Sequence, residues 1–499
     1  MQASRPALKA YLKKAIEENL QLGVCLNERG QVPSRAAQES PKESPKDALA
    51  SYEILKTPAL DTKALAKSTS IKPKSAIDAI KSLPSPCYLL YKQALDFNLR
   101  LLNQVATQSK CRVLVALKGY SFWREFDSVR SYLDGATCSG AWEARLAHEE
   151  ILSPLPQEEA AKKDICVFSP AYTESNLQEI LQYATHLIFN SFNQWQRFRD
   201  QLLAFNSERA AKGKKPVEIG LRLNPLYSEV EVQIYNPCAP KSRLGITPKE
   251  FYRGLDEWSR FYGYASQEEF FSREFSGLHF HTLCEQDSST LERTIERIKA
   301  HFAAYLPLAK WINLGGGHHI TKDGYDDTLL VSLIRNLKKE LGVEIFLEPG
   351  EAVGWQCGDL IGTVVDIVEN DGAVAILDIS ASCHAPDCLE MPYRADCYKI
   401  SFEDGGLKGR LEEDLGAGVG RYQYRLGGPT CLAGDVFGDY SFESKLQIGD
   451  KIAFCDMLHY TVVKNTTFNG IALPSLCVLK DDTLSLLKSF DYLDFKNRN

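Results

Sequence analysis

The chain has 499 residues, of which 44% are hydrophobic and 25% charged, and its net charge is −7. This length predicts two or three domains, and the composition is that of a globular protein with ample core. The net charge argues against broad nucleic-acid binding, and no apolar run is long enough to span a bilayer. The 14 cysteines form no C-x-x-C pair and no secretory signal precedes them, so we expect reduced thiols in the cytoplasm.

The first 82 residues differ from the rest of the chain. Pro6–Val24 carries one apolar stripe and predicts an amphipathic helix. Its basic residues leave organelle targeting open, although Glu17 and Glu18 are unusual in such a peptide. From about residue 27 to residue 82 the sequence is rich in Ser, Pro, Lys, Ala and Glu, which bury too little apolar surface to offset the entropy of ordering. We therefore expect residues 1–82 to be a largely disordered extension.

Eight short apolar runs alternate with amphipathic helical patterns in the next part of the chain. The runs are residues 112–117, 135–139, 164–169, 186–190, 218–224, 277–282, 310–316 and 344–350, and the clearest helical patterns are 123–133, 141–152, 192–205, 291–306 and 328–342. Eight such units predict a closed (β/α)8 barrel of the TIM type over residues 83–350. An open doubly wound sheet is the alternative. Three charged stretches, 154–163, 206–215 and 267–274, are interpreted as surface insertions.

The pattern changes past Glu351. Residues 360–370, 373–380, 422–428 and 451–463 read as strands separated by turn residues, with little helix between them. We therefore expect an all-β C-terminal domain over residues 351–499. Four residues in it resemble a metal cluster, but their spacing matches no common zinc pattern, so we expect no metal; they are Cys383, His384, Cys388 and Cys397.

The residues at the ends of the predicted barrel strands have complementary chemistry. Lys118 ends the first strand, Arg222 lies near the end of the fifth and His281 near the end of the sixth, while Gly315–Gly317 end the seventh and Glu348 the eighth. In a barrel of this type the carboxyl ends of the strands form one rim. A lysine, an imidazole, a glycine turn and a carboxylate on one rim are what a pyridoxal phosphate site requires.

Each of these residues has a structural interpretation as well. A glycine turn is often only a tight turn, and a single lysine is usually a surface residue. His279 and His281 alternate on one strand and should face opposite sides, so one of them is a candidate core histidine; His281 is preferred for function by its position. His318 and His319 follow the glycines and are interpreted as loop residues. The joint arrangement, not any one residue, favours a site.

Long stretches of the chain resemble the fold-type III, alanine-racemase-like pyridoxal-phosphate decarboxylases, which include ornithine and diaminopimelate decarboxylases. The strings are ALKGYSFW, DGATCSGAWEARLAHEE, LRLNPLYSEV, YNPCAPKSRLG, GLHFHTLCE, NLGGGHHIT, EPGEAV, SCHAPDCLEMPYR, YRLGGPTCLAGDVFGDYSF and LHYTVVKNTTFNG. They cover almost everything from residue 85 to about residue 474. Within the family the chain is most similar to the carboxynorspermidine and carboxyspermidine decarboxylases.

The resemblance implies roles for the residues at the rim. Lys118 would form the Schiff base with the cofactor and His281 would stack on its ring. Gly315–Gly317 would hold the phosphate, together with Tyr460, and Glu348 would keep the ring nitrogen protonated. Arg222 belongs to the same set of cofactor-binding residues.

The resemblance also implies a shared site. Cys431 matches the cysteine that a partner subunit delivers as proton donor, so a head-to-tail homodimer is expected. Glu351 and Asp387, with Glu390 as a weaker candidate, match the acidic positions that hold the amines of the substrate. No nucleic-acid or membrane partner is expected.

Three departures bear on the substrate. Glu351 stands where ornithine decarboxylase has an arginine, Leu432 stands where it has an aspartate, and Thr137 replaces another aspartate near its lysine. These changes favour decarboxylation of carboxynorspermidine or carboxyspermidine in polyamine biosynthesis. Three alternatives stay open: another amino-acid decarboxylase of the diaminopimelate, arginine or ornithine type, a racemase on the same fold, and a non-catalytic regulatory homologue.

Overall fold

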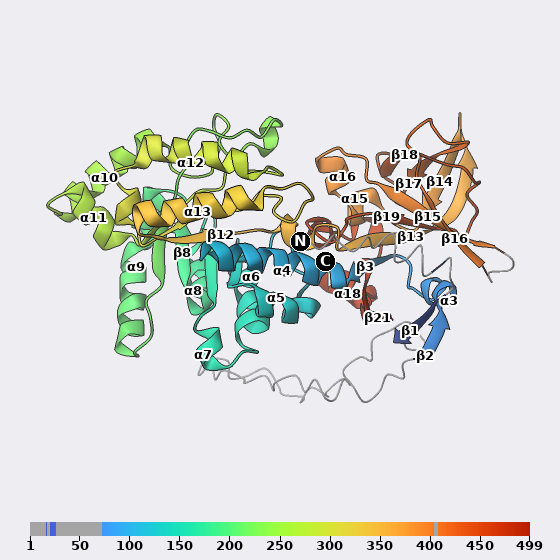
Figure 1. The fold of residues 1–499 in the computed structure, drawn as a ribbon, viewed down its shortest axis with the longest axis horizontal. Coiled ribbons are helices and arrows are strands. Elements are labelled where there is room, and N and C mark those ends of the chain that lie inside the picture. The colour runs from blue at the N-terminus through green and yellow to red at the C-terminus, as the bar shows by residue number, and fades with distance from the viewer. Residues whose placement is uncertain (1–15, 17–19, 26–71, 404–407) are drawn as a thin grey trace. The chain divides into compact units, whose positions relative to one another are not determined.

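The computed structural model describes residues 16, 20–25, 72–403 and 408–499. It consists of two units. The barrel unit comprises residues 93–357 and 456–464, and the β unit comprises the described residues up to 92 together with 358–455 and 465–499 (Figure 1). Among the described residues, no helix has the length and apolar character needed to cross a membrane.

The barrel unit is built on a parallel sheet that closes on itself. Its strands are β4 (Arg112–Val113), β5 (Val115–Ala116), β6 (Gly135–Cys138), β7 (Asp164–Phe168), β8 (His186–Phe189), β9 (Glu218–Arg222), β10 (Gly277–His279), β11 (Trp311–Asn313) and β12 (Glu344–Leu347). β4 pairs with β12, whereas β5 pairs with β6. β4 and β5 are two halves of one strand, because Leu114 between them continues the pairing and donates its N–H to Leu347 O at 2.9 Å. The predicted (β/α)8 barrel is therefore confirmed.

Helices surround the sheet and their caps fix its rim (Figure 1). They are α4 (Lys92–Ser109), α5 (Phe126–Tyr132), α6 (Ala141–Ala147), α7 (Gln157–Ala160), α8 (Glu174–Tyr183), α9 (Phe192–Ala211), α10 (Pro248–Tyr262), α11 (Gln267–Glu274), α12 (Ser288–Phe302), α13 (Asp327–Leu341), α14 (Glu351–Gly354) and α17 (Thr461–Lys464). Ser191, Asp287 and Asp326 cap α9, α12 and α13 by accepting a backbone N–H from the first turn. Because each cap lies in a loop that follows a strand, these loops are held at the carboxyl ends of the strands.

The interior of the barrel is packed around Trp311. Its ring fills space beside two glycines on neighbouring strands, where an added Cβ would lie 2.4 Å from the ring at Gly220 and 2.1 Å at Gly277. The ring N–H donates to Glu218 at 2.7 Å, so its polar atom is satisfied inside the barrel. Only residues without a side chain leave room for this ring.

The predicted surface insertions are partly regular structure. Residues 206–211 continue α9, and α11 forms from residues 267–274. α11 is not a surface insertion, because Phe270 and Phe271 are fully buried and Glu274 accepts two hydrogen bonds from Arg199 Nε at 3.0 Å. The charges of this stretch hid an amphipathic helix that covers the outside of the barrel.

The β unit contains the predicted β domain and four elements from the N-terminal part of the chain. Its elements are β1 (Gln21–Cys25), β2 (Lys72–Ser75), α3 (Ala76–Lys81), β3 (Cys87–Tyr91), β13 (Gly358–Glu369), β14 (Ala373–Leu377), α15 (Ala381–His384), α16 (Asp387–Glu390), β15 (Cys397–Glu403), β16 (Lys408–Glu413), β17 (Tyr422–Gly427), β18 (Val436–Phe442), β19 (Lys451–Phe454), β20 (Ser475–Lys480), β21 (Thr483–Lys488) and α18 (Tyr492–Arg498). Its strands form one sheet, in which β14 joins β13 to β17 and β18.

The N-terminal expectation needs two corrections. Gln21–Cys25 is a strand and not the end of a helix, because it pairs with β2 and with β21. Residues 72–82 are not disordered, since Ile77 and Ile80 of α3 are buried and Ser75 caps the helix. The pairing and burial that order these segments come from distant strands. Ile16 is helical, as expected, and is buried. The rest of the expected helix and of the expected disordered extension lies outside the described residues.

The units also differ from the expected continuous domains. β3 pairs with β13 and β20 of the β unit, although the sequence grouped it with the barrel. Residues 456–464, expected as part of a strand, belong instead to the barrel unit. The chain therefore enters the β unit before the barrel and returns briefly to the barrel afterwards.

Candidate active site

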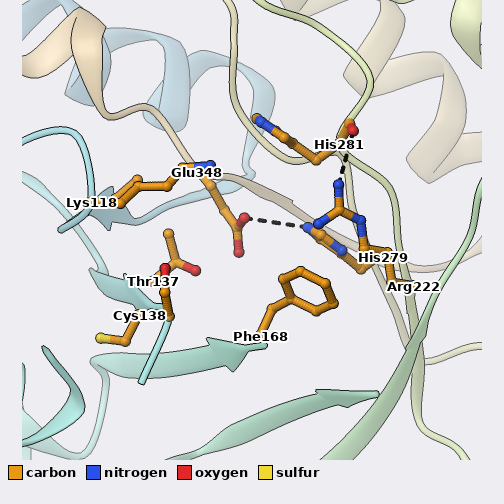
Figure 2. A pocket seen from close by; sticks show the side chains of 10 residues that line it. Lys118, Thr137, Cys138, Phe168, Arg222, His279, His281 and Glu348 are labelled. Atoms are coloured by element: carbon orange, nitrogen blue, oxygen red, sulfur yellow. Dashed lines mark hydrogen bonds and ion pairs between the residues drawn. The ribbon is translucent and has the colours of Figure 1, made fainter. Parts of the chain in front are cut away.

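A pocket opens at the carboxyl ends of the barrel strands (Figure 2). The space inside it, including space open to solvent, is about 370 Å³. Its walls are Ala116, Lys118, Thr137, Cys138, Ser139, Phe168, Arg222, His279, His281 and Glu348. Four residues predicted from the sequence, Lys118, Arg222, His281 and Glu348, thus line one pocket.

Two glycines bring the loops of Lys118 and Glu348 together. A Cβ on Gly119 would lie 2.9 Å from Gly350 Cα, so the backbones after the first and last strands touch. The N–H of Ala116 also donates to Pro349 O at 2.8 Å. This contact gives a physical reason for the glycine that follows the lysine and for the glycine of the EPG turn.

Lys118 has the properties of a nucleophilic amine. Its side chain is accessible to solvent through the pocket, while the pocket wall removes most of the surrounding bulk water. This desolvation, and then the charge of Arg222, lower the pKa of Lys118. A larger fraction of this amine is therefore in the neutral, nucleophilic form than in a surface lysine.

Glu348 is a buried carboxylate that stays ionised. Burial alone would raise its pKa, but His279, Asn313 and Thr137 together hold the pKa at about 2. Asn313 Nδ2 donates to Oε1 at 2.6 Å, and His279 Nε2 lies 3.4 Å from Oε2. Each oxygen therefore has its own partner, and Figure 2 shows the carboxylate pointing into the pocket.

Both histidines of β10 and the loop after it line the pocket, contrary to the expectation that they face opposite sides. β10 ends at His279, so strand alternation no longer applies at His281. His281 Nδ1 accepts the N–H of Gly316 at 2.9 Å, which requires that nitrogen to be unprotonated. Burial, Lys118 and Arg222 lower the pKa of His281 well below its usual range, so the ring is neutral.

The glycine turn requires glycine at each position. Gly315 and Gly317 have φ of 72° and 82°, and a Cβ on Gly316 would lie 2.1 Å from Glu348 O. The N–H of Gly315 donates to Asn313 Oδ1 at 2.9 Å, while that of Gly316 is taken by His281. Asn313 thus links the turn to Glu348. Phosphate binding by the turn stays a prediction.

Arg222 supplies a buried positive charge. Only 5% of the residue is exposed, and burial lowers its pKa to about 10. Its guanidinium lies 4.4 Å from the centroid of the Phe168 ring and donates to His281 O at 3.2 Å. The arginine therefore holds the loop that carries His281 in place.

The remaining predicted residues are divided between the two units. Tyr460 belongs to the barrel unit and donates its N–H to Gly119 O at 2.8 Å, one residue from Lys118. Glu351 begins α14 and pairs with His319 at 3.1 Å. Cys431 and Asp387 belong to the β unit and not to the barrel unit that forms this pocket.

Sequence reasoning missed His279 and Asn313. The signal available in the sequence was that each of them ends a barrel strand. His281 was nevertheless preferred to His279 as the functional residue. Asn313 was read as an ordinary strand residue. Their function depends on which side of the barrel wall they face, and this follows from strand pairing.

The comparisons agree with this geometry. Residues 60–457 match the family described as pyridoxal-dependent decarboxylase, C-terminal sheet domain, and the chain belongs to this family. The set of groups in the pocket fits the cofactor, since an amine, an ionised carboxylate and a neutral ring face one cavity. The protein is therefore a pyridoxal-phosphate-dependent decarboxylase.

Two relatives and one solved structure narrow the class. The chain is 40% identical to the carboxynorspermidine/carboxyspermidine decarboxylase of Campylobacter jejuni, over 84% of this chain and 99% of the relative. It is 38% identical to the carboxyaminopropylagmatine decarboxylase of Synechocystis, over 84% and 96%. The crystal structure of carboxynorspermidine decarboxylase from Campylobacter jejuni, complexed with norspermidine, has a TM-score of 0.67 and 38% identity, covering 84% of this chain and all of that one.

Proposed function

We propose that this enzyme decarboxylates carboxynorspermidine or carboxyspermidine and releases norspermidine or spermidine, as a step of polyamine biosynthesis. The observation that carries the proposal is the 40% identity over nearly the full length of a relative with that name. The ionised Glu351 supports it, because an enclosed carboxylate suits a cationic tail. Burial would raise the pKa of Glu351, but His319 and His459 lower it below its usual range.

Each pocket residue would have its own role in the reaction. Pyridoxal phosphate supplies a sink for the electron pair left on the α-carbon when CO₂ leaves. Lys118 would hold the cofactor through its side-chain nitrogen, and the ionised Glu348 would hold a proton on the ring nitrogen. The neutral ring of His281 would lie against the cofactor ring without adding charge.

The cofactor phosphate and the substrate tail would have their own partners. Gly315–Gly317 and Tyr460 would bind the phosphate, and the buried charge of Arg222 would offset the negative charge of the cofactor. Glu351 would bind one ammonium of the substrate. Asp387, with Glu390 beside it on α16, would bind another.

Cys431 would complete the reaction by donating its thiol proton to the α-carbon, where that proton replaces CO₂. The thiol is exposed on a loop that two hydrogen bonds hold in place. The N–H of Cys431 donates to Asn469 Oδ1 at 3.0 Å, and the hydroxyl of Thr430 donates to Asp435 at 2.7 Å. An exposed thiol on a fixed loop suits delivery to the pocket of a second subunit. The enzyme would then be a homodimer with shared sites.

A mixing experiment tests this arrangement. Lys118→Ala and Cys431→Ala would each be inactive alone. Unfolded and refolded together in equal amounts, they should recover about a quarter of the wild-type activity, because half of the dimers then carry one intact site. Absence of recovery in a mixture that contains heterodimers would show that each site is built within one chain.

A second substrate has a specific observation in its favour. The relative at 38% identity is named a carboxyaminopropylagmatine decarboxylase, and that substrate ends in a guanidinium instead of an ammonium. One product assay separates the two. The holoenzyme is supplied with carboxynorspermidine, carboxyspermidine, carboxyaminopropylagmatine, ornithine and diaminopimelate, and we expect the highest kcat/KM for the first two. Preference for any other substrate overturns the proposal.

We also propose that the reaction takes place in the cytoplasm. The cysteines that the structure describes are all unbridged, and nine of them are buried. Reduced, enclosed thiols of this kind are typical of proteins that are not exposed to an oxidising compartment. Fractionation of cells that express the full chain tests this point.

A further inference from the structure

Four ionisable side chains form a row in the barrel unit, outside the cofactor pocket. His319 Nε2 lies 3.1 Å from Glu351 Oε2, and His459 Nδ1 lies 3.8 Å from Glu351 Oε1. The other ring nitrogen of His459, Nε2, lies 3.2 Å from Asp456 Oδ1. The order is therefore Asp456, His459, Glu351, His319. These residues come from three separate parts of the chain, so the row exists only in the folded protein.

The row is enclosed. The side chain of Glu351 is 17% exposed, that of His319 is 6% exposed and that of His459 is 14% exposed. A carboxylate this deep would take up a proton if it had no partner, because an isolated buried charge is costly. An imidazole on each side of Glu351 offsets that cost.

A tryptophan holds both imidazoles. The ring of Trp355 lies 4.8 Å from that of His319 and stacks on that of His459 at 6.0 Å, with 28° between the planes. Trp355 follows Glu351 by four residues, so one turn of chain carries both the carboxylate and the ring that fixes its partners. The close fit of Gly354, where a Cβ would lie 3.0 Å from His459 Cβ, holds the segment from the other side.

Backbone contacts fix the two loops that carry the histidines. The N–H of His319 donates to Gln286 O at 3.1 Å, and the N–H of Gln356 is bound by Asp456 Oδ1 at 2.5 Å. His459 precedes Tyr460, whose N–H is bound beside Lys118. The residues that hold Glu351 are thus adjacent in sequence to the glycine turn and to the tyrosine predicted for the cofactor.

Two further charges face the row. One of them is Glu285. Burial raises the pKa of Glu285, and the negative charge of Glu351 raises it further. Lys322 Nζ lies 5.7 Å from the centroid of Trp355. Burial, Glu285 and Glu351 raise the pKa of the Cys284 thiol to about 11, while Lys118 acts in the opposite direction.

The geometry also shows which carboxylate has a partner apart from Glu351. Both ring nitrogens of His459 face carboxylates, with Nε2 3.2 Å from Asp456 Oδ1 and Nδ1 3.8 Å from Glu351 Oε1. Asp456 is therefore paired at the end of the row, whereas Glu351 lies between the two imidazoles.

Building on the proposed function, we propose that His319 and His459 are positioning residues that hold Glu351 ionised and oriented for an ammonium of the substrate, and so set substrate affinity and not the rate of the chemical step.

Matched variants separate this role from a purely structural one. His319→Leu removes the donor, whereas His319→Gln keeps a side-chain N–H donor. We expect His319→Leu to raise KM for carboxynorspermidine about 10- to 100-fold with kcat changed less than about threefold, and His319→Gln to restore most of the affinity. His459→Leu and His459→Gln should behave in the same way. His301→Gln, on α12 outside the row, is the control.

Binding of norspermidine to the holoenzyme, measured by calorimetry, gives a readout without turnover. The affinity should fall about 10- to 100-fold in His319→Leu and should stay close to that of the wild type in His319→Gln. The cofactor absorption spectrum should be unchanged in all variants. Equal losses in the Leu and Gln variants would overturn the inference.

The same measurement distinguishes the inference from the proposed function. If the wild type decarboxylates none of the carboxylated triamines, the proposed function fails. The binding experiment still decides the role of the histidines, because it needs no reaction. Loss of norspermidine binding in His319→Leu and its recovery in His319→Gln support the role, whereas a wild type that does not bind norspermidine overturns it.

Discussion

Glu348 and Glu351 lie three residues apart, both are enclosed, and both have a pKa below the usual range, but they are held by different kinds of structure. The partners of Glu348, His279 and Asn313, end barrel strands, so the closed sheet fixes them. The partners of Glu351, His319 and His459, lie on loops. A rigid frame suits a group that must face one cofactor atom, whereas loop residues suit a site whose ligand differs between relatives.

The largest expected effect is at the rigid carboxylate. Glu348→Gln should lower kcat about 10²- to 10³-fold with little change in KM, because an amide cannot stabilise a protonated ring nitrogen. Steady-state kinetics with saturating pyridoxal phosphate measures this, and the cofactor spectrum checks that the site is loaded. A variant with normal kcat would remove Glu348 from the reaction.

Glu351→Gln should show the opposite pattern. We expect KM for the triamine substrate to rise about 10- to 50-fold, more than kcat falls, because the substrate loses a charged partner while the reacting atoms are untouched. Kinetics on the two carboxylated triamines gives both constants. An unchanged KM would exclude Glu351 from substrate binding. The proposed difference between Glu348, which affects kcat, and Glu351, which affects KM, would then be wrong.

A smaller effect is expected from the packing between the glycine turn and Glu348. Gly316→Ala places a Cβ against Glu348 O and should destabilise the protein by about 1–3 kcal/mol and weaken cofactor binding. Gly140→Ala is the control, because a Cβ there meets nothing within 4 Å. Thermal unfolding with and without pyridoxal phosphate compares them. Equal stability of the two variants would contradict the close contact.

The smallest effect concerns acid stability. The folded pKa of Glu348 is about 2 and its ordinary value is 4.5, so its ionisation stabilises the fold above about pH 4.5 and this contribution is lost as the pH falls toward 2. In urea unfolding, the difference between wild type and Glu348→Gln should therefore shrink between pH 5 and pH 3. A difference that stays constant over this range would mean that Glu348 is not held ionised by its partners.

The elements that could be read from the sequence are those with a local signal. The eight strands were visible as short apolar runs, and Lys118 and Glu348 were visible because each ends such a run. Strand β3 was assigned to the wrong neighbours because its apolar run says nothing about its partners. Helix α11 was missed because its charges outnumber its two buried phenylalanines.

By itself, the sequence determined the barrel, the residue types on its rim and the family, because alternation, strand ends and long motifs are properties of neighbouring residues. Only the tertiary structure decided that His279 faces Glu348, that Asn313 connects Glu348 to the glycine turn, and that two histidines 140 positions apart enclose Glu351. Those contacts depend on how strands close and loops meet. Interactions between distant residues leave no regular spacing in a single sequence, so they appear only once the chain is folded.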